Sequence, residues 1–104
     1  MTDEHLTALL AERVMGWSIG PDRFMTGNRS WLSRWRFQPV EKLADALRLL
    51  EVAAPEEYSL RGDGEGNSWV HVRIDNAAGE ACSASKPCAI TWAIARAVGI
   101  EVEQ

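Results

Sequence analysis

The amino-acid sequence predicts an α+β protein in which a small antiparallel sheet packs with three helices. Amphipathic stretches with a helical period stand before and after one block of alternating residues. Runs of helices and strands, rather than strict alternation, are typical of α+β chains. The connections within the strand block are too short for parallel crossovers, so we expect antiparallel strands. The predicted order is helix, aromatic segment, helix, three strands and helix.

One domain is expected to span residues 1–104. A chain of 104 residues is the usual size of a single domain. On folding it buries roughly 60–70% of the surface that the unfolded chain exposes. The apolar fraction of 46% and the charged fraction of 25% are those of an ordinary globular protein.

The first helix is predicted over residues 3–15. Asp3 suits the positive N-terminal end of the helix dipole, and Gly16 is a natural stop because a left-handed turn costs glycine little. The apolar stripe follows the 3.6-residue period. It consists of Leu6, Leu9, Leu10 and Val14.

Residues 17–38 have no helical period and are rich in aromatic side chains. Two turn signals, Gly20-Pro21-Asp22 and Gly27-Asn28, interrupt this segment. A fourth strand is an open alternative over residues 31–37, because every second residue would share one side of an extended chain. The residues on that side are Trp31, Ser33, Trp35 and Phe37.

The second helix is predicted over residues 39–53. Pro39 fits the first helical position, and Pro55 lies just past the end. The expected apolar stripe is Val40, Leu43, Ala44, Leu47 and Leu50, and the expected solvated face is Glu41, Lys42, Asp45 and Arg48.

Residues 57–85 are predicted to form a three-stranded antiparallel meander. The strands are expected near residues 58–61, 69–75 and 80–84, with a glycine-rich hairpin loop and a turn over residues 76–79. The middle strand alternates clearly. Its apolar side is Val70, Val72 and Ile74, and its other side is Trp69, His71, Arg73 and Asp75.

The last helix is predicted over residues 87–98. Ser85 is the expected N-cap, with Lys86 as an alternative; Gly99 is the expected stop, and Ile100 is the apolar residue that packs after the stop. A row of small residues should let this helix approach the sheet closely. These residues are Ala89, Ala93 and Ala97.

Three motifs resemble those of a known family. Residues 12–17 read Glu-Arg-Val-Met-Gly-Trp, which is similar to the end of the first helix in the phage ABA sandwich domain. Residues 89–99 carry the Ala-Ile, Ala, Ala and Gly spacing with which that family closes, and residues 35–39 resemble its aromatic-plus-proline element. The resemblance covers nearly the whole chain. It implies a phage or prophage origin and an α/β/α-type layered packing, and it implies no activity.

Charge and cysteine usage limit the classes of partner. The 15 acidic and 11 basic residues give a net charge of −4, which argues against double-stranded DNA, because binding it requires a basic surface. No N-terminal run is apolar enough for a signal peptide or a membrane span, so we expect a cytoplasmic protein without a membrane partner. Cys82 and Cys88 are then expected to be thiols. No histidine has ligand spacing from them, so we expect no metal and no cofactor.

The most distinctive chemistry lies in residues 22–36, where arginines alternate with aromatic side chains. Arginine holds phosphates through two hydrogen bonds, and aromatic faces stack on bases, so this segment is a candidate site for a nucleotide. The alternative is structural: the aromatics pack, and the arginine side chains lie over them. The arginines are Arg23, Arg29, Arg34 and Arg36, and the candidate binding residues are Trp31, Arg34, Trp35 and Arg36.

A second candidate is the polar side of the middle strand, with Trp69, His71 and Arg73. If nothing covers it, this strip suits a ligand or a second subunit; if it is covered, Trp69 belongs to the core. Cys82 would be a nucleophile only with a base beside it, and His71 on the neighbouring strand is the one candidate. The strand register decides whether the two side chains face the same side or opposite sides of the sheet, and the sequence leaves it open.

No catalytic motif is found, and we assign no catalytic residue. The sequence therefore favours a non-enzymatic accessory protein that acts by binding, as a protein-interaction module or by self-association. The alternative is a small-ligand protein that binds a phosphate-bearing nucleotide through Arg34, Arg36 and Arg73 and stacks it on a tryptophan. An enzyme is the third hypothesis.

Overall fold

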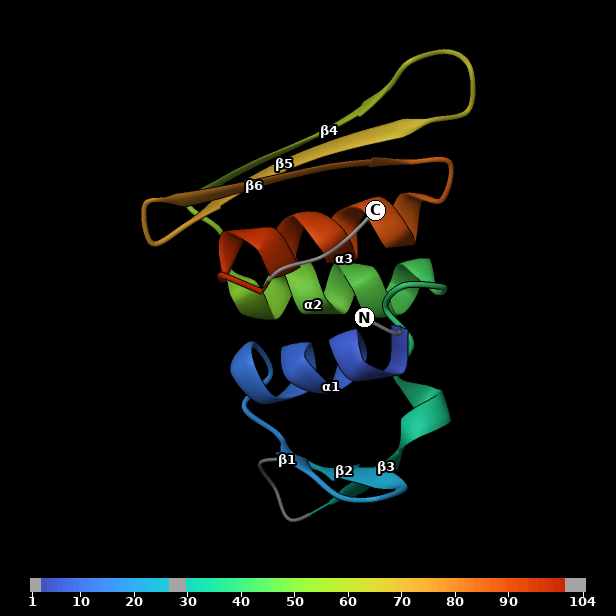
Figure 1. Cartoon of the computed structure of the whole chain (residues 1–104), viewed down its shortest axis with the longest axis vertical. Coiled ribbons are helices and arrows are strands. Elements are labelled where there is room, and N and C mark those ends of the chain that lie inside the picture. Colours follow the sequence, from blue (N-terminus) through green and yellow to red (C-terminus); the bar gives the residue numbers. More distant parts are fainter. Residues whose placement is uncertain (1–2, 27–29, 101–104) are drawn as a thin grey trace.

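The computed structural model of the chain describes residues 3–26 and 30–100, which fold into three α-helices and two antiparallel three-stranded sheets (Figure 1). The elements in order are α1 (Asp3–Arg13), β1 (Ser18–Ile19), β2 (Arg23–Met25), β3 (Trp31–Ser33), the 3₁₀ turn η1 (Arg34–Arg36), α2 (Leu43–Ala53), β4 (Glu57–Gly62), β5 (Ser68–Ile74), β6 (Ala77–Ser83) and α3 (Lys86–Ala97). We call β1–β3 the small sheet and β4–β6 the large sheet.

The helices lie between the two sheets along the longest dimension of the molecule, 42 Å (Figure 1). α3 packs under β5 and β6, α2 packs on α3, and α1 separates these helices from the small sheet. The α+β class and the predicted element order are confirmed, including the three-stranded meander. Of the small sheet, the sequence offered only one strand, over residues 31–37, as an open alternative.

The end of α1 follows the predicted glycine stop. Gly16 adopts a φ of +73°, and the Trp17 amide donates to the Ala11 carbonyl at 2.9 Å, a bond from the sixth residue back. The left-handed glycine reverses the chain, so that a carbonyl near the end of the helix still receives a backbone hydrogen bond. The helix ends at Arg13, two residues earlier than predicted.

The aromatic segment is organised differently from the expected strand over residues 31–37. That strand stops at Ser33, because residues 34–36 wind into η1, where the Phe37 amide donates to the Arg34 carbonyl. The turn breaks the alternation, so Phe37 is fully buried while Trp35 points outward. The expected turn at residues 27–28 and the candidate Arg29 lie outside the described residues.

Three rings form the core between α1 and the small sheet. Trp17, Phe24 and Phe37 are buried, with ring centroids 5.1 to 6.1 Å apart and largely edge-on geometry. Such tilted pairs add about 0.5–1.5 kcal/mol each to the area they bury. The smaller sheet is therefore held by its own aromatic cluster.

The start of α2 differs from the prediction. Residues 39–41 form a turn, and Pro39 is buried there rather than at the first helical position. The Pro39 carbonyl accepts a hydrogen bond from the Thr91 hydroxyl of α3 at 2.8 Å, so tertiary contact fixes this turn. The buried face is also rotated: Ala46, Leu49 and Leu50 face inward. Leu43, Ala44 and Leu47 of the expected stripe are exposed, as are the charged Glu41, Lys42 and Arg48.

The large sheet matches the predicted meander, with longer first and third strands. Val70 and Val72 of β5 are buried against α3, and Ile74 is half-buried. The β5–β6 turn is made by Asp75 and Asn76, both at positive φ, rather than by residues 76–79. This tight connection adds three residues to the start of β6 and places Gly79 inside the strand.

α3 is buried on most of its circumference, because it lies between the large sheet and α2. Its N-cap is Ser85, as predicted, whose hydroxyl accepts from the Cys88 amide at 3.4 Å. Gly99 adopts a φ of +87°, and the buried Ile100 follows it, as expected.

Candidate binding surfaces

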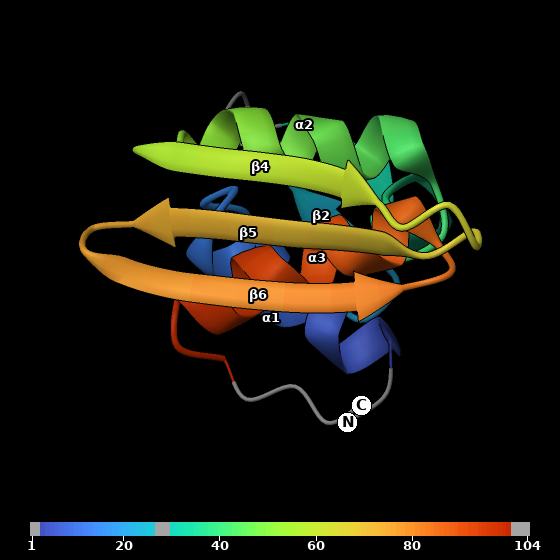
Figure 2. The ribbon, with the colours of Figure 1, turned by 90° about the horizontal axis from the view of Figure 1, so that it is seen from above.

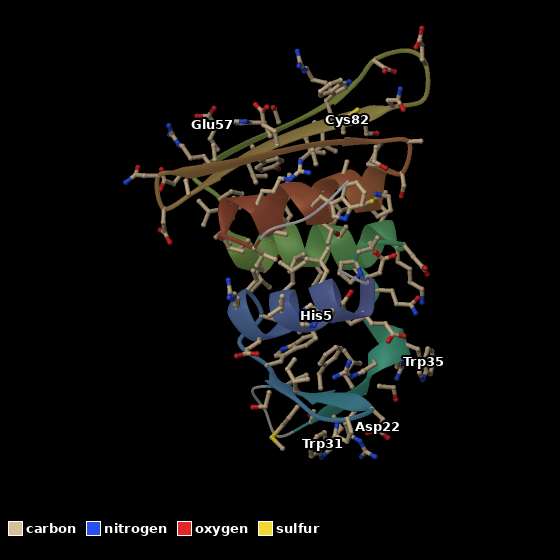
Figure 3. All side chains as sticks on the ribbon, in the orientation of Figure 1. His5, Asp22, Trp31, Trp35, Glu57 and Cys82 are labelled. Carbon is tan, nitrogen blue, oxygen red and sulfur yellow. The ribbon has the colours of Figure 1, made fainter. Side chains whose placement is uncertain are left out.

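The predicted site residues fall into two groups at opposite ends of the molecule (Figures 1 and 3). The first group belongs to β3 and η1 and consists of Trp31, Arg34, Trp35 and Arg36; the second belongs to β5 and consists of Trp69, His71 and Arg73. Since the helices separate the two groups, one small ligand cannot touch Arg34, Arg36 and Arg73 together, as the nucleotide hypothesis requires.

At the small-sheet end, two tryptophans are largely exposed, and each has an arginine beside its ring (Figure 3). Trp31 is 53% exposed, with the Arg23 guanidinium 5.2 Å from its ring centroid; Trp35 is 65% exposed, with Arg36 at 5.6 Å. Arg23 is also paired with Asp22 at 3.0 Å, which lowers the pKa of that carboxyl. The arginines therefore lie over aromatic rings, as the structural alternative predicts.

Arg34 of η1 packs against the small sheet and forms a hydrogen bond with the loop after β1. Its guanidinium lies 5.4 Å from the Phe24 ring centroid, and its Nη2 donates to the Gly20 carbonyl at 2.9 Å. Its Nε is buried and has no hydrogen-bond partner among the described residues. A buried donor without a partner is uncommon in native proteins and is a feature that a ligand or a water molecule can satisfy.

A cleft of about 240 Å³ lies beside Arg34, between η1 and the start of α1. Trp35 and Arg34 line one part of it. Three carboxylates line another part, from Asp3, Glu4 and Glu41. Like charges repel, so these acids oppose the entry of a phosphate group.

At the other end, the outer face of the large sheet is open. The strands lie in front of the helices when the sheet is seen from above, and the helices are all on its far side (Figure 2). Trp69 of the central strand is 46% exposed on this face, between Arg61 of β4 and Cys82 of β6. A depression of about 280 Å³ beside it is lined by Ser59, Arg61, Trp69, Val70, His71 and Glu80.

His71 and Arg73 of β5 are paired with carboxylates, whereas Arg61 on the same face makes no ion pair in the described part of the chain. His71 Nδ1 lies 3.0 Å from a carboxylate oxygen of Glu80, and Arg73 contacts Glu56 and Glu57 at 3.5 Å each. Because these pairs are exposed, each stabilises the fold by only about 0–1 kcal/mol. The outer face thus combines one exposed indole with charges of both signs.

The strand register shows which side of the large sheet the side chains of Cys82 and His71 face. Cys82 pairs with Trp69, and Glu80 pairs with His71, so both side chains lie on the outer face. The imidazole takes Glu80 as its partner. Cys82 and Cys88 are both thiols, and burial raises the pKa of the Cys88 thiol.

The described ranges, 3–26 and 30–100, meet the requirements neither of a metal-binding group nor of a membrane-spanning helix. No group of three His, Cys, Asp or Glu side chains there is arranged to hold a metal ion. None of the helices in the same ranges has the length and apolarity needed to cross a membrane.

Several neighbours of the predicted site residues could not be found from the sequence alone. Arg61 and Glu80 join the Trp69 face only through the strand register, and Arg23 joins Trp31 through the small sheet. The alternation of β5 indicated which residues share its face, but it carries no signal about the facing strands.

Comparison with known proteins supports the resemblance noted in the sequence. The family model described as the phage ABA sandwich domain matches residues 8–96. Among solved structures, a phage protein from Bacillus cereus ATCC 14579 is similar, with a TM-score of 0.79 and 19% identity over 99% of this chain and 93% of that chain. At this identity the likeness shows the fold. No curated protein matches the chain. The chain belongs to the phage ABA sandwich domain family and is a small phage-associated domain.

Proposed function

We propose that the protein is a non-enzymatic accessory protein of phage or prophage origin that acts in the cytoplasm by binding another protein. The binding surface in this proposal is the outer face of the large sheet around Trp69. The observation that carries it is the 46% exposure of Trp69 on the central strand, on a face that no helix covers within the described part of the chain (Figure 2).

The exposed indole and the mixed charges of this face favour a protein as the partner. An exposed indole gains free energy when it leaves water, and tryptophan and arginine are enriched among the residues that dominate protein interfaces. Arg61 of β4 lies opposite Trp69 in the strand register. A depression beside Trp69 is also lined by His71 and Glu80. Charges of both signs suit a partner surface with complementary charges, and they do not suit a polyanion.

A displayed library of random peptides tests the proposal, because it samples many partner sequences at once and the natural partner need not be identified. The wild-type chain is the bait, and Trp69→Ser is used in parallel. We expect peptides with apolar anchors that bind the wild type and lose at least about tenfold in affinity on Trp69→Ser, because removal of an interface anchor costs more than about 1.4 kcal/mol.

The matched control is Trp31→Ser, since Trp31 is exposed to a similar degree at the opposite end of the molecule. Peptides that depend on Trp69 and tolerate Trp31→Ser support the proposal. Peptides that bind equally well to the Trp69→Ser variant, or a library that yields no Trp69-dependent binder, contradict it.

The small-sheet end supports a second candidate, a small phosphate-bearing ligand of the nucleotide type. The unpartnered Nε of Arg34 and the exposed ring of Trp35 favour this candidate, and the carboxylates of Asp3, Glu4 and Glu41 oppose it. AMP added at millimolar concentration would raise the melting temperature if it bound the folded state. The effect should be lost in Trp35→Ser, which removes the exposed ring; an unchanged melting temperature in the wild type excludes AMP as the ligand.

A further inference from the structure

We propose that a second copy of this chain docks on the open edge of β4 and joins two large sheets into one of six strands. β4 is the terminal strand in the order β4-β5-β6, so one of its edges has no neighbouring strand in the described part of the chain (Figure 2). The proposal concerns this edge rather than the face around Trp69. It therefore goes beyond the proposed function, and either can fail without the other.

The edge of β4 lacks several of the features that normally prevent strand addition, although it carries the charges of Glu57 and Arg61. Natural edge strands are protected by proline, lysine, bulges or a covering element. β4 is six residues long, with the sequence Glu-Tyr-Ser-Leu-Arg-Gly, and all six residues are exposed. It contains neither proline nor lysine, so it presents a continuous template for another strand.

The backbone groups of β4 alternate between its neighbour β5 and the open edge. The Asp63 amide donates to the Asn67 carbonyl at 3.2 Å, at the closed end of the hairpin. Bonded pairs recur at every second residue of an antiparallel ladder. The N–H and C=O groups of Tyr58 and Leu60 consequently point to the open edge, where a second strand could form hydrogen bonds with them.

One antiparallel register makes β4 complementary to itself. A twofold axis at Ser59 places Glu57 opposite Arg61 of the second copy and Tyr58 opposite its Leu60. Facing residues then lie on the same side of the sheet, as strand pairing requires. Each of these contacts occurs twice by symmetry, which is the property of a closed dimer interface.

The charges of β4 fit this register. In the described structure Arg61 makes no ion pair, while Arg73 is contacted by both Glu56 and Glu57 at 3.5 Å. Glu57 can therefore approach a second arginine and leave Arg73 with Glu56. Docking gives Arg61 the carboxylate partner that the single chain does not offer.

The apolar residues of β4 also lack cover in the single chain. Tyr58 and Leu60 point to the side of the sheet that carries the helices, yet they are 56% and 37% exposed, because α3 packs under β5 and β6. A groove of about 320 Å³ continues from Tyr58 along α2. It is lined by Leu47, Leu50, Glu51, Ala54, Pro55 and Tyr58. A second β4 would place its own Tyr58 and Leu60 against this surface.

Charge reversal with cross-complementation tests the register. In sedimentation velocity, the wild type should show concentration-dependent dimers. Glu57→Arg and Arg61→Glu should each raise the dimer dissociation constant at least about tenfold, because both symmetric pairs become repulsive. An equimolar mixture of the two variants should restore the dimer, since each repulsive pair becomes attractive in the heterodimer.

Three controls separate this outcome from others. Arg13→Glu reverses an exposed charge on α1, away from the large sheet, and should leave the dimer intact. Melting curves of each variant report whether it folds. Trp69→Ser should remain dimeric even if it loses peptide binding. A wild type that stays monomeric up to about 1 mM, where association is worth only about 4 kcal/mol, overturns the proposal. A dimer that the mixture does not restore also overturns it.

Discussion

Gly79 of β6 lies directly against the backbone of Ala93 in α3. A β-carbon on Gly79 would lie 2.1 Å from the Ala93 carbonyl oxygen and 2.6 Å from the Ala97 amide nitrogen. Backbone atoms of a packed helix cannot move aside as a flexible side chain can. The distance between the large sheet and α3 is therefore set by the absence of a side chain at this position.

Gly79→Ala is expected to destabilise the chain severely, by about 3 kcal/mol or more, because it forces the sheet and the helix apart. Gly62→Ala is the matched control: its β-carbon meets only the Asn67 carbonyl oxygen, at 3.9 Å, and should change the free energy of unfolding by less than about 0.5 kcal/mol. Urea unfolding of both variants measures the difference. Similar midpoints for the two would contradict the close approach.

The hydrogen bond between Thr91 and Pro39 supports a second prediction. Thr91→Val keeps the shape of the buried side chain but leaves the Pro39 carbonyl without its donor. Loss of a buried partner should lower the free energy of unfolding by about 1–3 kcal/mol. Thr7→Val, at the rim of the cleft beside Arg34, makes the same chemical change and should cost less. Equal losses would show that the Pro39 contact is unimportant.

The β4–β5 hairpin loop predicts a pH dependence. The Asp63 carboxylate accepts hydrogen bonds from Asn67 and from the Glu65 amide, and these bonds lower its pKa below the ordinary value of 3.8. The folded chain thus favours the ionised form. This contribution to stability is complete above the ordinary pKa, and it is lost as the pH falls through the lowered value.

Asp63→Asn should therefore flatten the fall in melting temperature below about pH 4, where the ordinary carboxyl begins to take up protons. The same substitution at Asp75, whose side chain accepts no hydrogen bond in the described structure, is the control and should leave the slope unchanged. A slope unaffected by Asp63→Asn would contradict this role for the loop carboxylate.

Sequence patterns predicted the elements whose structure depends on local chemistry. The alternation of Val70 and Val72 indicated the central strand, and the cap at Ser85 and the stop at Gly16 indicated helix ends, because each is a property of a few neighbouring residues. The residues that share the outer face of β5 could be predicted in the same way, whereas the absence of a covering helix could not. Its side chains Trp69, His71 and Arg73 lie together as the period of two requires.

The parts that the sequence missed depend on distant contacts. Pro39 reads as a helix start, but its carbonyl is bound by Thr91, 52 residues away. β1 and β2 have two and three residues, too few for a periodic signal, and they form because β2 pairs with both β1 and β3 beside the aromatic core. Gly79 reads as a turn residue, and only the close approach of α3 explains its place within a strand.

The central claim, that the outer face of the large sheet is the binding surface, is tested most directly by fluorine NMR. The chain contains 5 tryptophans. In 5-fluorotryptophan-labelled protein each resonance can be assigned by a single Trp→Phe change, and a library-selected peptide is then titrated in. We predict that the Trp69 resonance shifts while those of Trp31 and Trp35 stay in place. A shift at Trp31 or Trp35 with Trp69 unchanged would contradict the claim and move the binding surface to the small sheet.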